Sequence, residues 1–208
     1  RLSVVYPEIT VMQVRAIIGA AIDATDQGYR PFPEIMIPLV VNVREIRLIN
    51  EIIERTIHEL VSDKKVSISY KIGTMMETPR ACLGADRLAP AVEFMSFGTN
   101  DLTQMTYGFS RDDAARFVPQ YLDKKLIETD PFVSLDQRAV GRLIEMSVAD
   151  SAARKKGIKY GICGEHGGDP RSIRFCHETG LDYVSCSPYR VPVARIAAAQ
   201  ANVAGQES

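Results

Sequence analysis

The sequence predicts an α/β protein with parallel strands and a single domain over residues 1–208. Short apolar runs alternate with amphipathic helical segments five times along the chain, which is typical of strand–helix–strand units with right-handed crossovers. The apolar runs are continuous rather than alternating, as expected for strands covered on both faces. Two architectures fit this pattern, an open doubly wound sheet and a (β/α)8 barrel. Five units are too few for a complete barrel, which typically needs about 250 residues.

The first unit begins with a helix over residues 8–25, which ends before Gly28. Its apolar positions Ile9, Met12, Ile17 and Ala21 are expected near one face. A strand over 34–41 follows. A helix to about residue 62 then begins at Asn42, where Glu45 completes a capping-box signal.

The later units repeat the pattern with local start and stop signals. Thr78-Pro79 begins one helix, because proline favours the first helical position. Asp169-Pro170 begins another, and Gly180 ends it. A long irregular insertion is expected over 107–137, and loops of that length are often functional. The remaining expected elements are strands at 66–72, 93–97, 160–163 and 183–186 and a last helix at 190–201.

The overall composition excludes several classes of function. The formal net charge is -1, so no basic field points to nucleic acid, and no apolar run is long enough to cross a membrane. The start of the chain lacks signal-peptide features. The four cysteines include no C-x-x-C pair, which favours reduced thiols in a cytoplasmic protein. Zinc at the Cys163–His166 stretch is a weaker alternative, because the usual paired spacing is missing.

Carboxylates follow two consecutive predicted strands. Glu77 comes after the second strand, and Asn100-Asp101 comes after the third. Taken singly, Glu77 is an ordinary loop charge and Asn100-Asp101 an ordinary helix cap. In parallel α/β folds, however, the carboxyl ends of the strands form the ligand-binding edge. Two carboxylates at that edge suit Mg²⁺, and Gly98 and Thr99 would allow an anionic oxygen to approach the backbone.

A third candidate, Cys163, ends the fourth predicted strand within Gly161-Ile-Cys-Gly-Glu-His-Gly-Gly168. Most single cysteines are simply small buried apolar residues. The flanking glycines and charges favour a chemical role, because a thiol with a pKa of about 8.5 can donate a proton and take it back. Glu165 and His166 can orient the thiol or only satisfy backbone groups. Arg111 is either a loop ion pair or a phosphate contact.

Five strings together resemble the pyruvate, phosphate dikinase family over essentially the whole chain. They are Ile72-Gly-Thr-Met-Met-Glu-Thr-Pro-Arg80, Phe97-Gly-Thr-Asn-Asp-Leu-Thr-Gln-Met105, Gly108-Phe-Ser-Arg-Asp-Asp113, Cys163-Gly-Glu-His-Gly-Gly-Asp169 and Ser187-Pro-Tyr-Arg-Val-Pro192. Phosphoenolpyruvate synthases and enzyme I of the sugar phosphotransferase system share the Gly-x-Asn-Asp pattern. They do not resemble the chain at Cys163-Gly-Glu-His or at Ser110-Arg-Asp-Asp.

The resemblance implies the C-terminal five units of a (β/α)8 barrel, truncated at its N-terminus, that binds pyruvate or phosphoenolpyruvate with Mg²⁺. By position, Glu77 and Asp101 match the metal ligands, Gly98, Thr99, Asn100 and Asp101 match substrate contacts, and Cys163 matches the proton donor. Glu77 is also expected to lie against the substrate.

The same resemblance implies partners outside this chain. The family reaction interconverts ATP, phosphate and pyruvate with AMP, diphosphate and phosphoenolpyruvate, through a phosphohistidine on another domain of the full-length chain. A homodimer is expected, and the 208-residue chain alone is expected to be inactive in the full reaction. The alternatives are a non-catalytic binding or dimerisation module, a related phosphoenolpyruvate-utilising enzyme, and another metal-dependent pyruvate-handling barrel such as a lyase.

Overall fold

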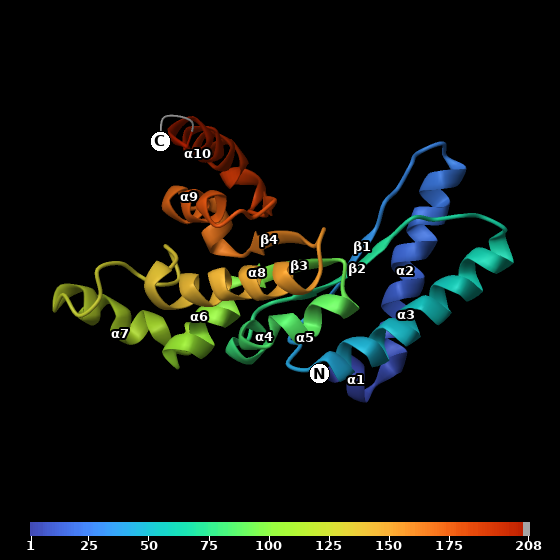
Figure 1. Ribbon diagram of the computed structural model, residues 1–208, viewed down its shortest axis with the longest axis horizontal. Coiled ribbons are helices and arrows are strands. Elements are labelled where there is room, and N and C mark those ends of the chain that lie inside the picture. The colour runs from blue at the N-terminus through green and yellow to red at the C-terminus, as the bar shows by residue number, and fades with distance from the viewer. Residues whose placement is uncertain (206–208) are drawn as a thin grey trace.

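The computed structural model describes residues 1–205 and contains a five-stranded parallel sheet with helices between the strands (Figure 1). The strands lie in the sheet in the order of the sequence. The structure therefore confirms the predicted parallel α/β fold. The strands are β1 Glu34–Ile37, β2 Lys71–Met75, β3 Phe94–Gly98, β4 Lys159–Cys163 and β5 Tyr183–Val184.

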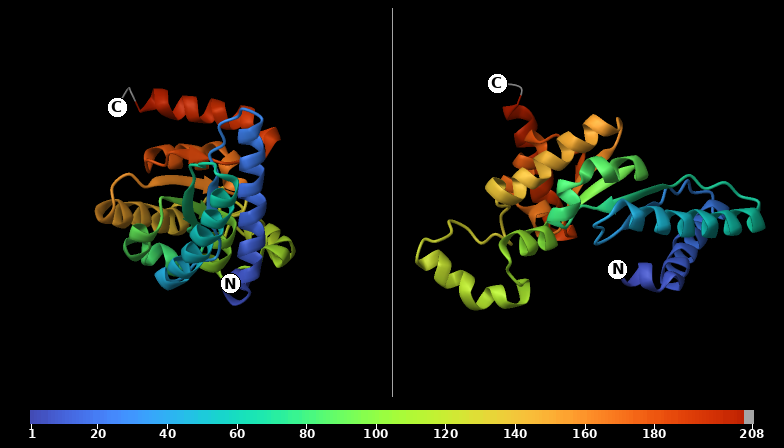
Figure 2. Two further views of the ribbon diagram at one scale, coloured as in Figure 1. Left: turned by 90° about the vertical axis from the view of Figure 1, so that its right-hand side faces the viewer. Right: turned by 60° about the horizontal axis from the view of Figure 1, so that its bottom comes forward.

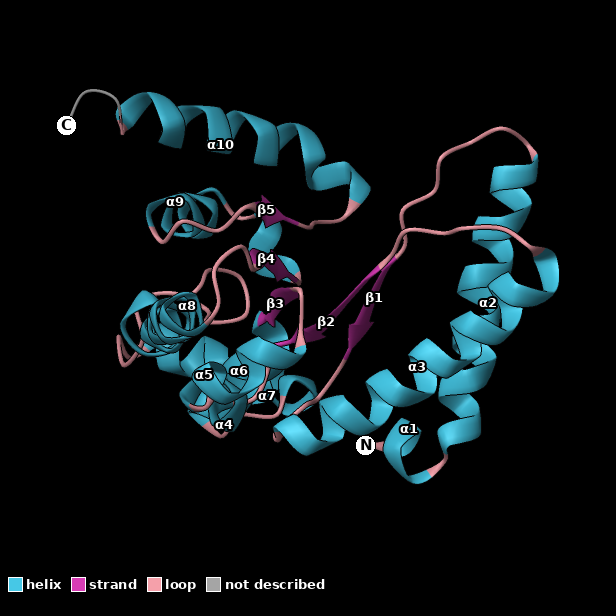
Figure 3. Ribbon diagram, turned by 45° about the vertical axis from the view of Figure 1, so that its right-hand side comes forward, coloured by secondary structure: helices cyan, strands magenta, loops and turns pink. Residues whose placement is uncertain are grey.

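The strand order favours the barrel type of α/β architecture. A doubly wound sheet reverses its strand order at a switch point, whereas this sheet does not. The α4–α5 pair, α8 and α9 all lie on the same side of the strands (Figure 3). The helices are α1 Leu2–Val5, α2 Pro7–Asp26, α3 Val43–Lys64, α4 Pro79–Leu83, α5 Ala85–Leu88, α6 Thr99–Tyr107, α7 Arg111–Asp123, α8 Arg142–Arg154, α9 Pro170–Glu178 and α10 Val191–Ala204.

The structure confirms the local signal predicted for the start of α3. Asn42 caps α3 by accepting from the Arg44 amide, and the Glu45 side chain accepts from the Asn42 amide, so the capping box is present. The predicted apolar face of α2 was partly wrong, because Met12 and Ile17 are exposed. The buried positions follow steps of three or four residues from Thr10 to Val14, to Ile18 and from there to both Ala21 and Ile22, as one face of a helix requires.

Three strands have boundaries that differ clearly from the prediction. β1 ends at Ile37 rather than residue 41, because Pro38 has no backbone N–H to donate and Leu39 has a left-handed φ of 53°. β2 covers Lys71–Met75 rather than 66–72, because Glu34 pairs with Lys71 and so fixes where the two strands run together. β5 is also shorter than expected and ends at Val184.

The predicted irregular insertion contains regular structure. Residues 111–123 form α7, which projects from the rest of the molecule (Figure 2, right view, yellow-green). Its buried residues pack with Phe132 in a small hydrophobic cluster separate from the main core. The prediction of an irregular segment was therefore wrong for α7. A π-helical turn at Gln137–Gly141 leads from this segment into α8.

The two faces of the sheet have different partners. Met95 and Phe97 of β3 belong to the main hydrophobic core. Phe94 points to the opposite face, because side chains alternate along a strand. On that face the Phe94 ring covers Gly73, where an added Cβ would lie 2.5 Å from the ring atoms. The same face carries the site residues described next.

Candidate functional site at the carboxyl ends of β2, β3 and β4

Adjacent strands bring the predicted residues to one edge of the sheet. Glu77 follows the end of β2 by two residues, and Thr99–Asp101 form the first turn of α6 directly after β3. Cys163 is the last residue of β4 and pairs in register with Gly98 of β3. The structure thus brings the candidate residues of the three strands together.

Glu77 is the most enclosed of the charged candidates, with 4% of its surface exposed. The Leu39 amide donates a hydrogen bond to Glu77 Oε1 at 2.6 Å. Burial raises the pKa of the Glu77 carboxyl, and the charge of Asp101 raises it further, while the Leu39 hydrogen bond lowers it. Gly98 allows this placement, because a Cβ there would lie 2.6 Å from Glu77 Oε2.

Asp101 lies beside Glu77, and Asn100 adds a further oxygen atom in the same turn of α6. Gln104 Nε2 donates to Asp101 Oδ1 at 2.9 Å, which holds that carboxylate in the first turn of α6. Asn100 Oδ1 is buried and accepts no hydrogen bond from residues 1–205. Buried polar atoms are normally paired, so this oxygen is available to a ligand.

These oxygen atoms fit a divalent cation that is only partly held by protein. Among residues 1–205, neither Glu77 nor Asp101 forms an ion pair. Two such carboxylates suit Mg²⁺, which usually takes one or two carboxylates and completes its octahedron with substrate and water. Within the described part of the chain, no group of three or more His, Cys, Asp and Glu residues is arranged to hold a metal ion. The protein residues alone therefore do not complete a metal site.

Cys163 is half-buried, and its thiol lies 3.6 Å from the Phe97 carbonyl oxygen, to which it donates. Burial raises the pKa of Cys163, and the charges of Glu77 and Asp101 raise it further, whereas the Ser96 hydroxyl lowers it. The thiol is therefore protonated near neutral pH. This state suits a proton donor and disfavours a thiolate nucleophile.

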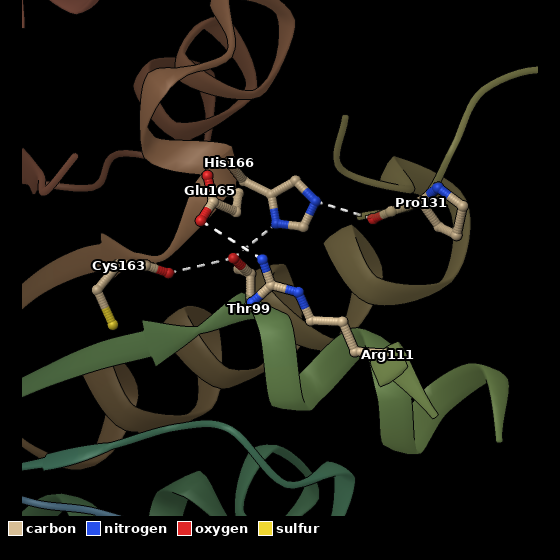
Figure 4. Close-up of polar contacts among 6 residues, drawn as sticks. All are labelled: Thr99, Arg111, Pro131, Cys163, Glu165 and His166. Atoms are coloured by element: carbon tan, nitrogen blue, oxygen red, sulfur yellow. Dashed lines mark hydrogen bonds and ion pairs between the residues drawn. The ribbon is translucent and has the colours of Figure 1, made fainter. Parts of the chain in front are cut away.

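The loop after Cys163 connects the site to the segment before α8 (Figure 4). His166 is fully buried, with Nδ1 2.7 Å from Thr99 Oγ1 and Nε2 2.8 Å from the Pro131 carbonyl oxygen. Thr99 Oγ1 also lies 3.2 Å from the Cys163 carbonyl oxygen. Arg111 forms an exposed ion pair with Glu165 at 3.5 Å. Of the two interpretations that the sequence left open for Arg111, the ion pair is present with Glu165 as its partner, and the phosphate contact stays a prediction.

Two residues near the thiol were missed in the sequence. Ser96 is buried on β3, and its oxygen has no hydrogen-bond partner of good geometry among residues 1–205. It nevertheless lowers the pKa of both Cys163 and Tyr183. The Tyr183 ring covers Gly161, where an added Cβ would lie 2.0 Å from it. Alternation along β3 offered a signal, because Ser96 shares the face of Gly98.

All four cysteines are unpaired, as the sequence predicts, and Cys82 and Cys176 are buried inside helices. Burial raises the pKa of Cys82 to about 11 and that of Cys176 to about 12. Both are therefore inert packing residues rather than reactive thiols. In residues 1–205, no helix has the length and apolar character needed to span a membrane.

The fold and the site together define a barrel-type α/β domain with carboxylates and a thiol at the carboxyl ends of its strands. Residues 1–203 match the family described as PEP-utilising enzyme, PEP-binding domain, and the chain belongs to that family. This finding confirms the family resemblance that the sequence motifs indicate.

The curated relatives are pyruvate, phosphate dikinases. The chain is 54% identical to that of Clostridium symbiosum over 202 residues, covering 97% of this chain and 23% of the relative. It is 56% identical to that of Rhizobium meliloti over 208 residues, covering 100% and 23%. It is 52% identical to the chloroplastic protein of Mesembryanthemum crystallinum over 200 residues, covering 96% and 21%. The chain thus spans less than a quarter of the length of these relatives.

One solved structure supports the fold alone. A citrate lyase from Burkholderia xenovorans LB400 superposes with a TM-score of 0.53 and 22% sequence identity, covering 79% of this chain and 48% of that chain. At this identity the likeness extends to the arrangement of strands and helices and not to the chemistry.

Proposed function

We propose that this chain is the substrate-binding part of a pyruvate, phosphate dikinase and that it binds pyruvate or phosphoenolpyruvate with Mg²⁺. The observation that carries the proposal is the convergence of Glu77, Asp101 and the protonated thiol of Cys163 at one edge of the sheet. The identity of 50–56% to dikinases supports the choice of this reaction over that of other phosphoenolpyruvate-utilising enzymes.

In this proposal, Glu77 and Asp101 hold the cation, and the unpaired Oδ1 of Asn100 contacts the bound substrate or its water. Mg²⁺, when bound, would supply positive charge that stabilises the enolate oxygen of the substrate. Within residues 1–205, no side chain caps the N-terminus of α6, where Gly98 is the N-cap residue. The first backbone amides of the helix can therefore donate to an anionic group.

Cys163 carries the proton in both directions. When pyruvate forms, the phosphoryl group leaves the enol oxygen for a histidine on another domain. The electron pair of the carbon–carbon double bond then takes the thiol proton at the terminal carbon. In reverse, the resulting thiolate removes a methyl proton, and the enolate oxygen attacks the phosphoryl group. The raised pKa of Cys163 favours the protonated thiol once pyruvate has left, so the sulfur is ready to protonate the next enolate.

The partners of this reaction are part of the proposal. We place the phosphohistidine on a domain of a longer chain, because the dikinases are more than four times as long as the matching segment. We also propose a homodimer. α10 exposes apolar side chains that a second copy would cover, namely Val191, Val193, Ile196 and Val203. Sedimentation of the longer protein tests this assembly.

The test uses a chimera in which this chain replaces the matching segment of the Rhizobium meliloti dikinase. Methyl proton exchange of pyruvate is followed by NMR, and binding of oxalate, an enolate mimic, is followed by calorimetry with and without Mg²⁺. Cys163→Ala should abolish exchange and keep oxalate binding. Cys186→Ala is the matched control, because Cys186 is also half-buried and follows the next strand.

Exchange that persists in Cys163→Ala would remove the thiol from the mechanism. A chimera that binds oxalate without exchange, even with Cys163 intact, would favour the alternative of a binding or dimerisation module. Oxalate binding that is independent of Mg²⁺ and of Glu77 would overturn the proposed metal site.

A further inference from the structure

The segment between α6 and α8 has its own small core. Ala114, Val118 and Phe132 are buried together and form a cluster separate from the main hydrophobic core. Phe109 and Phe117 pack edge to face beside it, with ring centroids 4.8 Å apart. Residues 109–132 therefore form a small packed unit. Its position relative to the sheet depends on the contacts that join the two bodies.

Most of these contacts lie away from the reacting groups. The Arg111–Glu165 ion pair has half-exposed partners, and such pairs contribute little. Ser134 Oγ donates to Asp169 Oδ2 at 2.9 Å, which ties the segment to the start of α9. One contact is different, because the side chain of His166 touches both the segment and the site.

The hydrogen bonds of His166 have a defined direction. Pro131 contributes a carbonyl oxygen, which can only accept, so His166 Nε2 must donate. Burial lowers the pKa of His166 and keeps the ring neutral, so Nδ1 accepts from the Thr99 hydroxyl. Thr99 has only one hydroxyl hydrogen, and the bond to Nδ1 therefore competes with the longer approach to the Cys163 carbonyl.

Thr99 leaves little freedom to the residues around it. It is fully buried, begins α6 and stands next to Asn100 and two residues before Asp101. A Cβ added at Gly164 would lie 3.3 Å from Thr99 Oγ1 and 3.2 Å from Asn100 Oδ1, so the loop after Cys163 packs directly on this turn. A shift of Thr99 would therefore displace both the Asn100–Asp101 turn and the loop after Cys163.

We propose that His166 is a positioning residue that connects residues 109–132 to the reacting groups through Thr99. The inference deepens the proposed function and rests on it. In this arrangement the packed unit is part of the catalytic architecture, although none of its own side chains reaches the thiol. Both hydrogen bonds of the ring are needed, one to hold the segment and one to hold Thr99.

Two substitutions separate the two bonds. His166→Asn places an acceptor near the Nδ1 position and keeps the Thr99 bond, whereas His166→Gln places a donor near the Nε2 position and keeps the Pro131 bond. Each should lower kcat for pyruvate methyl proton exchange in the chimera by about 10-fold or more, with KM changed much less, because misplacement by an ångström costs up to about 100-fold. A wild-type kcat in either variant would overturn the proposal.

Ser134→Ala is the matched control. It removes another hydrogen bond between the same segment and the loop that leads from β4 to α9, and no hydrogen bond joins Ser134 to Thr99 among residues 1–205. It should leave kcat near the wild-type value. A loss equal to that of the His166 variants would show a general loosening of the segment and would overturn the specific role of His166.

A double-mutant comparison tests the connection itself. Thr99→Val should lower kcat about 10-fold in the wild-type background and much less in His166→Gln, where the Thr99 bond is already lost. Equal losses in both backgrounds would contradict the inference.

If a His166 variant does not fold, a comparison of kcat between Thr99→Ser and Thr99→Val tests the role of the Thr99 hydroxyl. Serine keeps the hydroxyl and should therefore retain a higher rate than valine, and equal rates in the two would overturn the role of the bond.

A second readout separates this inference from the proposed function. The alkylation rate of Cys163, measured by peptide mass spectrometry against Cys186 in the same sample, reports the position of the thiol whether or not the protein turns over pyruvate. Both His166 variants should change the ratio at least about threefold, and Ser134→Ala should not. If the wild-type chimera shows no exchange, the proposed function fails, and this ratio still supports or overturns the role of His166.

Discussion

Gly98→Ala tests the packing that places Glu77 at the site. The structure leaves no room for a methyl group there, because a Cβ would lie 2.6 Å from Glu77 Oε2 and 2.8 Å from Glu77 Cβ. The backbone of Gly98 has an ordinary φ of -80°, so the cost comes from the contact and not from the conformation. The carboxylate must move, and the Leu39 amide then loses its acceptor.

The magnitude follows from these two losses. Overpacking a filled site costs about 1–3 kcal/mol. A buried donor without its acceptor costs about 1–3 kcal/mol more. We expect Gly98→Ala to lower the free energy of unfolding by about 2–6 kcal/mol in total. It should also weaken Mg²⁺-dependent oxalate binding by at least about tenfold, since Glu77 no longer lies beside Asp101.

Urea unfolding of the 208-residue chain and calorimetry of the chimera measure the two effects. Gly19→Ala is the control, because Gly19 lies inside α2 with no atom within 4 Å of an added Cβ. It should stabilise the chain by up to about 1 kcal/mol through helix propensity. The reasoning is refuted if Gly98→Ala unfolds at the same urea concentration as the wild type and binds oxalate equally well with Mg²⁺.

Two further predictions concern pH. Burial raises the pKa of Tyr107 to about 12, and its hydroxyl donates to Asp136 at 3.0 Å, so the unfolded chain ionises first and stability falls as the pH rises from about 10 to about 12. Tyr107→Phe should reduce the loss of unfolding free energy over this pH range. An unchanged dependence of the unfolding free energy on pH, measured by urea unfolding, would contradict the prediction. The alkylation rate of Cys163 should rise only above the pH at which an ordinary thiol ionises, since burial and two carboxylates oppose the thiolate. Glu77→Gln should move that rise to lower pH, and a rise at the same or higher pH would contradict the cause given.

The sequence predicted the features that depend on neighbouring residues. The capping box at Asn42 and Glu45 involves contacts three residues apart, and the structure confirms it. The proximity of Gly98 and Cys163 could also be predicted, because the carboxyl ends of parallel strands lie at one edge of the sheet. The boundaries of β2 could not be predicted, because the start of its pairing is set by Glu34, which is distant in the sequence.

The proposed role of His166 also depends on residues that are distant in the sequence. Its two partners lie 67 and 35 residues away, and one of them is a backbone carbonyl of the segment that was expected to be irregular. No local pattern distinguishes such a histidine from one that only satisfies backbone groups. Only the packing of residues 109–132 beside the loop after Cys163 reveals the connection.

The ionised carboxylate of Glu77 opposes folding, and this opposition is an argument for ligand binding at the site. The raised pKa of Glu77 means that the folded chain holds this proton more tightly than the unfolded chain does. Stability that is present in acid is therefore lost as the pH rises through the folded pKa, and ionised Glu77 next to Asp101 destabilises the fold at neutral pH. A divalent cation that binds only the folded site reverses this cost by mass action. Mg²⁺ should accordingly stabilise the wild-type chain more than Glu77→Gln, even before any substrate is present.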